Sequence, residues 1–215
     1  MTLFHGLLDK AQREEQAGRI YGVVVGIVTN NQDGDSLGRV KVRFPWLSDR
    51  DESHWARVAA PMAGKERGIY FLPEVDDEVL VVFEHGDVRF PYVLGALWNG
   101  KEPPPGKNQD GKNNLRLIKS RSGHTIKLND EAGKEQIEIV DKSEKNRIVF
   151  DTTRNTITIT SDQDIVLSAS KGTIKLDAQK IELNSSADTK IEAGAKMDVK
   201  AEATMTIKGA TVNIN

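Results

Sequence analysis

The chain has 215 residues, a formal net charge of −2 and no cysteine, so disulfides and thiolate metal sites are excluded. No apolar run approaches the roughly 20 residues of a membrane-spanning helix, and the N-terminal residues do not read as a secretory signal. The near-neutral charge argues against a general nucleic-acid or membrane-surface binder.

Residues 3–17 predict a short helix that ends at Gly18. A helix of this length is marginal alone and needs a surface to pack on. Its apolar residues are Leu3, Phe4, Leu7 and Leu8. From the residues alone, this cluster either docks on a partner protein or packs on the chain's own first domain.

Residues 19–99 predict several short strands separated by turns that contain glycine or proline. In GRVKVRFPWL, apolar and basic residues alternate strictly, which is typical of a half-buried strand. The apolar set is Val40, Val42 and Phe44, and the basic set is Arg39, Lys41 and Arg43. Five or six such strands in about 80 residues favour a small closed barrel.

The composition changes after this barrel. All seven prolines lie at or before Pro105, and Phe150 is the only aromatic residue after Trp98. The stretch KEPPPGKNQDGKNN is rich in Pro, Gly and Asn, which is typical of a linker. The predicted organisation is an N-terminal arm at 1–18, a barrel at 19–100, a linker at 101–118 and a second domain at 119–215.

In the second domain, pairs of apolar residues separated by one residue recur at intervals of about 9–11 and later about 6–10 residues. The two members of each pair point to one face of a strand. A repeat this short is one strand plus a turn, so the region is predicted to be a stacked β-structure.

One chain offers too little apolar surface for such a stack. A repeat of about eight residues buries side chains worth roughly 3–6 kcal/mol, whereas ordering its backbone costs roughly 8–16 kcal/mol. Three chains wound about one axis need fewer inward residues each and leave no side edges. We therefore predict an intertwined homotrimer. Its core residues are Ile157, Ile159, Ile165, Leu167, Ile174, Leu176, Ile181, Leu183, Ile191, Val199, Met205, Ile207, Val212 and Ile214.

Three segments within residues 39–100 resemble a known family. GRVKVRFPWL, WARVAAPMAGKERGIYFLPEVDDEVLVVFEHGD and PYVLGALWNG are similar to spike proteins of contractile injection machines, namely phage baseplate assembly protein V and the OB-fold portion of VgrG proteins. The later repeats resemble the triple-stranded β-helix of the same family. The resemblance implies an all-β fold, with an N-terminal OB-fold barrel followed by an intertwined trimeric triple-stranded β-helix needle.

The resemblance also implies a function. The chain would be a central spike that docks on a separate hub protein and mechanically pierces a target envelope, carrying effector cargo and touching the target membrane transiently. No catalytic residue, cofactor, metal or nucleic acid is expected. It would be synthesised in a bacterial or archaeal cytoplasm and built into a virion tail or injection particle, not secreted individually.

Its contact residues follow from the same resemblance. The hub would contact Leu3, Phe4, Leu7 and Leu8, and a PAAR-type tip protein would cover Val212, Asn213, Ile214 and Asn215. Two departures from the family stand out. Asp76 occupies a loop position that is often glycine, and no histidine follows His124 to form a metal apex.

Other candidate sites have ordinary interpretations that we favour. The histidines His5, His54, His85 and His124 are scattered and favour surface positions over a metal site. Asp76, Asp77 and Glu78 favour a solvated turn over a calcium site or a carboxylate pair.

Two rival functions stay open at this point. Arg39, Lys41 and Arg43, with Trp46, Tyr70 and Phe71 nearby, match the pattern of an OB-fold nucleic-acid binder, here with an oligomerisation tail. The other rival is a β-helical enzyme acting on polysaccharide. Its site needs paired acids in a cleft, and the narrow repeat argues against it.

Overall fold

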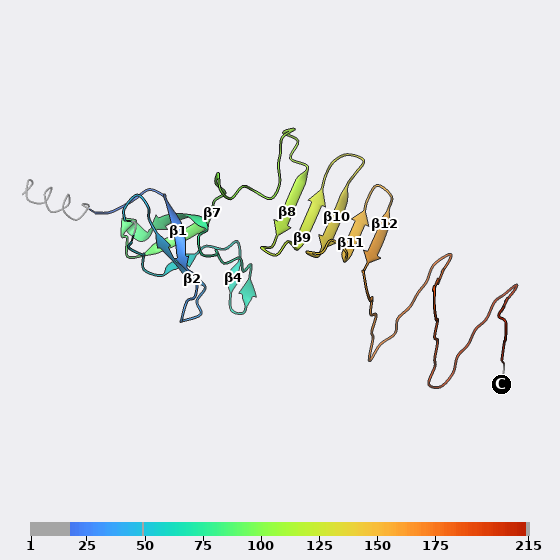
Figure 1. Cartoon of the computed structure of the whole chain (residues 1–215). Coiled ribbons are helices and arrows are strands. Elements are labelled where there is room, and N and C mark those ends of the chain that lie inside the picture. The colour runs from blue at the N-terminus through green and yellow to red at the C-terminus, as the bar shows by residue number, and fades with distance from the viewer. Residues whose placement is uncertain (1–17, 49, 214–215) are drawn as a thin grey trace, which may run out of the picture. The chain divides into compact units, whose positions relative to one another are not determined.

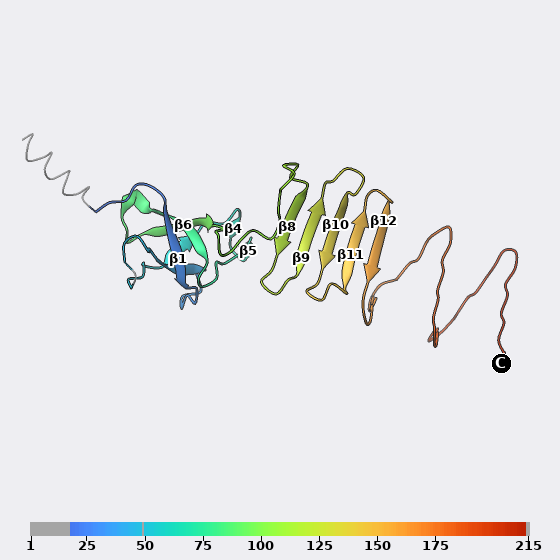
Figure 2. The same cartoon turned by 45° about the horizontal axis from the view of Figure 1, so that its top comes forward.

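The computed structural model describes residues 18–48 and 50–213 (Figures 1 and 2). Contacts divide the chain into one unit that ends at Asp162 and a second that begins at Gln163. The helix expected over residues 3–17 lies outside the described residues, as does the apolar cluster within it.

Five strands form a closed barrel in the order β1-β2-β3-β7-β6. They are β1 (Val24–Asn30), β2 (Arg39–Arg43), β3 (Ala56–Val58), β6 (Glu78–Phe83) and β7 (Pro91–Ala96). The pair β3 and β7 is parallel, and the other neighbouring pairs are antiparallel. The predicted OB-fold barrel is confirmed.

The barrel core consists of the residues at alternate strand positions, which point inward, and most of them are valine. Its buried members are Val28, Val40, Val42, Phe44, Ala56, Val79, Val81, Phe83 and Val93. The rings of Phe44 and Phe83 meet edge to face with centroids 5.5 Å apart. This small core is filled by branched side chains that suit a pleated surface.

Two short elements lie outside the barrel strands. The strands β4 (Ala63–Gly64) and β5 (Arg67–Gly68) pair only with each other, as a separate hairpin. The 3-10 helix η1 (Glu84–Gly86) connects β6 to β7. The amide of Ile20 donates to the carbonyl of Gly86 at 2.8 Å, which ties the segment before β1 to this connection.

A second sheet follows in the same unit. Its five antiparallel strands are β8 (Leu115–Lys119), β9 (Thr125–Asn129), β10 (Gln136–Val140), β11 (Arg147–Asp151) and β12 (Thr156–Thr160). Each strand pairs with the next in sequence, as Figures 1 and 2 show. The spacing of about 9–11 residues between the apolar pairs therefore corresponds to hairpins within one chain. The first strand of these hairpins, β8, begins inside the segment 101–118 that was expected to be a linker.

Residues 163–213 run as extended segments without strand pairing inside the chain (Figure 1). The all-β class is confirmed, since the residues given a structure contain strands and one 3-10 helix and no α-helix. No helix in this described part is long and apolar enough to cross a membrane. The intertwined trimeric needle depends on strands of other chains and stays a prediction.

Candidate assembly surfaces

One face of the sheet β8–β12 carries two continuous rows of large apolar side chains. In the first row, Ile118, Ile126, Ile139, Ile148 and Ile159 lie opposite one another on successive strands. In the second row, the same register aligns Leu128, Ile137, Phe150 and Ile157. Residues directly opposite on neighbouring strands have Cβ atoms about 4.5–5.5 Å apart, so the rows form one uninterrupted surface, here called the apolar face.

The apolar face is not covered by this chain. Most of its members are exposed, and Ile157 on the outermost strand retains 67% of its accessible surface. Burying one large aliphatic side chain is worth about 1.5–3 kcal/mol. A contiguous apolar patch of this extent marks an interaction surface.

The opposite face of the sheet is more polar, although it includes Leu115, Leu117, Val140 and Val149. Lys127 and Glu138 lie opposite each other on β9 and β10, and Nζ contacts Oε2 at 2.8 Å. On β12 the corresponding positions are Thr156, Thr158 and Thr160. The sheet is therefore two-faced, with one side suited to water and the other to a partner.

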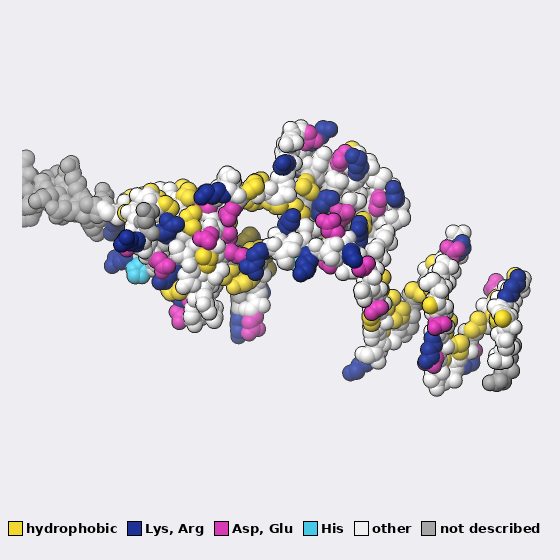
Figure 3. Space-filling model, viewed as in Figure 1, with side chains coloured by type: hydrophobic (Ala, Val, Ile, Leu, Met, Phe, Trp, Pro, Cys, Tyr) yellow, Lys and Arg dark blue, Asp and Glu magenta, His cyan; other side chains and the backbone are white. Residues whose placement is uncertain are grey.

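The segment 163–213 continues the same alternation without a sheet of its own. Four ion pairs link a lysine to the acid two residues later, so both charges lie on one side of the chain. The pairs are Lys175–Asp177, Lys180–Glu182, Lys190–Glu192 and Lys196–Asp198, with N–O distances of 3.1, 2.5, 2.7 and 2.8 Å. Figure 3 shows charged and apolar side chains alternating along this exposed segment.

Each of these ion pairs brackets one apolar residue that points the other way. The bracketed residues are Leu176, Ile181, Ile191 and Met197. Sequence reasoning missed Met197, although the repeated lysine–apolar–acid order would have revealed it. The charged side suits solvent and the apolar side suits a shared core.

The predicted core residues are brought to no common site within one chain. All the described ones are exposed: Ile157, Ile159, Ile165, Leu167, Ile174, Leu176, Ile181, Leu183, Ile191, Val199, Met205, Ile207 and Val212. Ile214 lies outside the described residues, and so does Asn215 of the predicted tip contact, whereas Val212 and Asn213 are exposed. The predicted hub contacts Leu3, Phe4, Leu7 and Leu8 also lie outside the described part.

The basic stripe on the outer side of β2 is matched by acids. Arg39 Nε and Nη2 donate to Oδ2 and Oδ1 of Asp33 at 2.8 and 2.7 Å, and Nη2 also meets Asp35 at 2.6 Å. Lys41 Nζ donates to Glu52 at 3.1 Å, and this hydrogen bond lowers the pKa of Glu52. These contacts pair the side chains of Arg39 and Lys41 with acids in the barrel's own loops. Most of the positive charge on this side of β2 is therefore neutralised within the barrel.

The acidic turn before β6 is also structural. The carboxylate of Asp77 accepts a hydrogen bond from the Glu74 amide at 2.7 Å, and Glu78 accepts one from Asn99 at 3.2 Å. His124 Nδ1 accepts a hydrogen bond from the Lys142 amide at 3.2 Å. Within residues 18–48 and 50–213, no three His, Asp or Glu side chains gather as metal ligands would.

Comparison with known proteins places the barrel in a family. Residues 24–98 match the family described as "Type VI secretion system/phage-baseplate injector OB domain". This range begins at the first residue of β1 and ends two residues after β7, so it covers the closed barrel.

Curated relatives match a longer segment. The "Type VI secretion system spike protein VgrG3" of Vibrio cholerae serotype O1 is 34% identical over 128 residues, covering 56% of this chain and 13% of that protein. "Type VI secretion system spike protein VgrG1b" of Pseudomonas aeruginosa is 33% identical over 139 residues, covering 58% and 18%. "Actin cross-linking toxin VgrG1" of Vibrio cholerae serotype O1 is 29% identical over 141 residues, covering 62% and 13%.

The matched segment thus spans less than a fifth of the length of each of these three relatives. The family match and the closed barrel cover the same residues. Residues 24–98 therefore form an OB domain of the kind found in phage-baseplate and type VI secretion system injectors.

Proposed function

We propose that three copies of this chain form the central spike of a contractile injection machine. The observation that carries this proposal is the uncovered apolar face of β8–β12, continued by the exposed apolar pairs of residues 163–213. Three copies related by a three-fold axis would turn these surfaces inward and leave the lysine–acid pairs in water. The backbone of residues 164–213, which forms no strand ladder within this chain, would then pair with strands of the other two chains.

The proposed role is mechanical. Sheath contraction drives the tube, and a stiff needle of dense backbone hydrogen bonds concentrates the force on a small area of the target envelope. The chain needs neither a catalytic residue nor a cofactor for this task. The match of residues 24–98 to the injector OB-domain family supports a place in such a machine.

The proposed partners are a separate baseplate hub at the barrel end and a PAAR-type tip protein over residues 212–215. Effector cargo and a transient contact with the target membrane complete the proposal. In the proposed trimer, such a tip protein would cover the exposed side chain of Val212. The particle would be assembled from subunits made in a bacterial or archaeal cytoplasm.

No described feature favours either rival function. The arginine and lysine that would attract nucleic acid are paired with Asp33, Asp35 and Glu52. The strands β8–β12 form an open sheet within the chain and not a wide single-chain solenoid with a cleft. The oligomeric spike is therefore the function that the geometry supports best.

Native mass spectrometry of the full chain tests this proposal with two neighbouring substitutions on β12. Ile157→Asp puts a charge on the apolar face, where three copies would meet at one axis, so the trimer should be lost. Thr158→Asp puts the same charge on the polar face and should leave the trimer intact. A monomeric wild type, or a trimer that tolerates Ile157→Asp, would contradict the proposal.

A further inference from the structure

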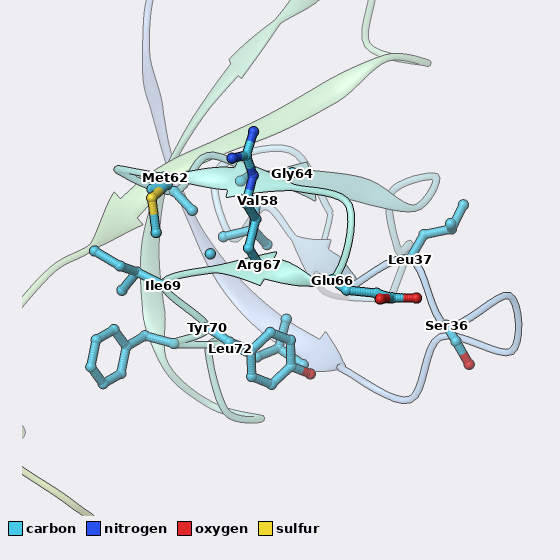
Figure 4. A pocket seen from close by; sticks show the side chains of 15 residues that line it. Ser36, Leu37, Val58, Met62, Gly64, Glu66, Arg67, Ile69, Tyr70 and Leu72 are labelled. Carbon is cyan, nitrogen blue, oxygen red and sulfur yellow. The ribbon is translucent and has the colours of Figure 1, made fainter.

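The β4–β5 hairpin stands apart from the barrel sheet. Ala63 lies opposite Gly68, and the amide of Ile69 donates to the carbonyl of Met62 at 3.0 Å. A groove of about 720 Å³, lined by Val58, Met62 and Leu72 among others, runs beside the hairpin (Figure 4). A two-stranded hairpin is marginal in water without a surface to pack on.

The tip of this hairpin is charged, with Lys65, Glu66 and Arg67 exposed, whereas the residues that flank the hairpin are apolar and exposed. Met62, Ile69, Tyr70 and Phe71 form what is here called the arm patch, and Figure 4 shows the first three projecting from the hairpin and the chain that follows it. Tyr70 retains 77% and Phe71 retains 69% of its accessible surface. Exposed aromatic residues on a projecting element are typical anchors of a protein interface.

A second apolar patch lies on different strands of the same barrel. Val25 lies opposite Leu80 on the outer side of β1 and β6, and Val82 follows on the same side of β6. Leu94 is the extra residue of a bulge opposite Leu80 and Val81, and it remains 46% exposed. Bulges re-aim side chains, and here the bulge adds Leu94 to an aliphatic surface, the wall patch.

The two patches fit the requirement of a closed ring. A ring of three identical subunits uses two different complementary surfaces on each subunit, because every contact is head to tail. The arm patch offers aromatic rings and the wall patch offers aliphatic side chains. Tyr70 and Phe71 also line a groove with Ile118, the first residue of the apolar face, so the arm patch continues the surface that the proposed trimer buries.

We propose that, in the trimer, the arm patch of each chain packs on the wall patch of the next barrel. The occupant of the wall patch is thus a second copy of this chain. This inference rests on the proposed trimeric spike. It goes further by naming the two barrel surfaces that would contact each other around the three-fold axis. The contact does not use Arg39 and Lys41 on the outer side of β2, which are already paired with acids of the same barrel.

Cysteine crosslinking tests the contact directly, because the chain has no cysteine of its own. The full-length double variant Phe71→Cys/Leu94→Cys is treated with a short bis-maleimide and run on a denaturing gel, with native mass spectrometry in parallel. We expect covalent dimers and trimers from the double variant and only monomers from either single variant. The control pair Phe71→Cys/Lys41→Cys, with one cysteine on the charged outer side of β2, should also stay monomeric.

Each other outcome overturns the proposal in a recognisable way. A native trimer in which Phe71→Cys/Leu94→Cys does not crosslink would assign the two patches to other proteins while leaving the trimeric spike intact. Crosslinking of Leu94→Cys with itself would show wall meeting wall. A wild type that is monomeric in native mass spectrometry would refute both the ring and the trimeric spike beneath it.

Discussion

At the scale of single residues, the turn before β6 shows how the chain replaces an expected glycine. The amide of Asp77 donates to the carbonyl of Glu74 at 3.1 Å, and the amide of Asp76 donates to Val28 on β1 at 2.9 Å. Asp76 has a φ of +77°, the left-handed region that L-residues other than Asn and Asp adopt rarely. The turn therefore accepts aspartate, as its short polar side chain allows, but at some cost in backbone strain.

This geometry predicts that Asp76→Gly stabilises the barrel. Glycine adopts positive φ without strain, although it gains more conformational freedom in the unfolded chain, so the net gain should be up to about 1 kcal/mol. Differential scanning calorimetry of the full chain should show a higher melting temperature for Asp76→Gly and a lower one for Asp76→Val. A Gly variant that melts below the wild type would show that the aspartate side chain contributes more than its strained backbone costs.

Asp33 is the most strongly held carboxylate among the described residues of the barrel. Its side chain is only 3% exposed. Besides Arg39, it accepts hydrogen bonds from the amides of Asp35 and Leu37, both at 3.1 Å. The Arg39 guanidinium, followed by these amides, holds the pKa of Asp33 well below its usual range.

The depressed pKa predicts acid sensitivity. Because the pKa of Asp33 is lower in the folded than in the unfolded chain, its stabilising contribution is complete above about pH 4. That contribution is lost progressively as the pH falls toward the folded-state value. In thermal melts, Asp33→Asn should therefore lower the melting temperature most at pH 7, somewhat less at pH 3 and less again near pH 2. Asp35→Asn, at a largely exposed position, serves as the control and should have a small effect at each pH.

At the scale of elements, barrel closure depends on close packing of β1 against β2. Gly26 lies on β1, where an added Cβ would overlap Cγ1 of Val42, a fully buried side chain. Gly95 on β7 differs, because an added Cβ at that position would meet no other atom within contact distance. Packing against the core therefore requires glycine at position 26 and does not require it at position 95.

The contrast between these glycines gives a matched test of the core. Gly26→Ala should destabilise the barrel by about 1–3 kcal/mol, the usual cost of overpacking a filled interior. Gly95→Ala should be close to neutral. Urea unfolding followed by tryptophan fluorescence measures both, and equal effects would mean that the core around Val42 relaxes freely.

Much of this architecture could be predicted from local pattern. The alternation of Val40 and Val42 with basic residues fixed the faces of β2, and the Ile137/Ile139 and Ile148/Phe150 pairs marked β10 and β11. The exposed arm patch could not be predicted, because Tyr70 and Phe71 follow a hairpin whose strands are too short to show alternation. Leu94 was equally hidden, since a bulge breaks the two-residue period.

At the scale of the whole molecule, the two units would need different things from other chains in the proposed trimer. The strands β8–β12 satisfy their ladder hydrogen bonds with neighbours in sequence, which favours rapid local folding. The edge of β12 that faces away from β11 has no partner strand among the described residues of the chain, and such an edge is a template for further pairing. In the proposed trimer, the sheet would fold first and give residues 163–213 a starting register for winding with the other chains.

Deleting residues 163–215 tests this division directly. With strands about 4.8 Å apart, the sheet would contribute roughly 24 Å of shaft, and the wound segment, rising about 14 Å per turn, roughly 30 Å more. The truncated chain should therefore form a shaft shorter by roughly 30 Å in electron micrographs, and its trimer should dissociate on dilution where the full-length trimer does not. The truncated chain should still melt cooperatively, because residues 18–162 keep their own core and ladders. A truncated trimer as resistant to dilution as the full-length one would mean that the barrels and sheets alone clamp the assembly, and that residues 163–215 serve only for reach.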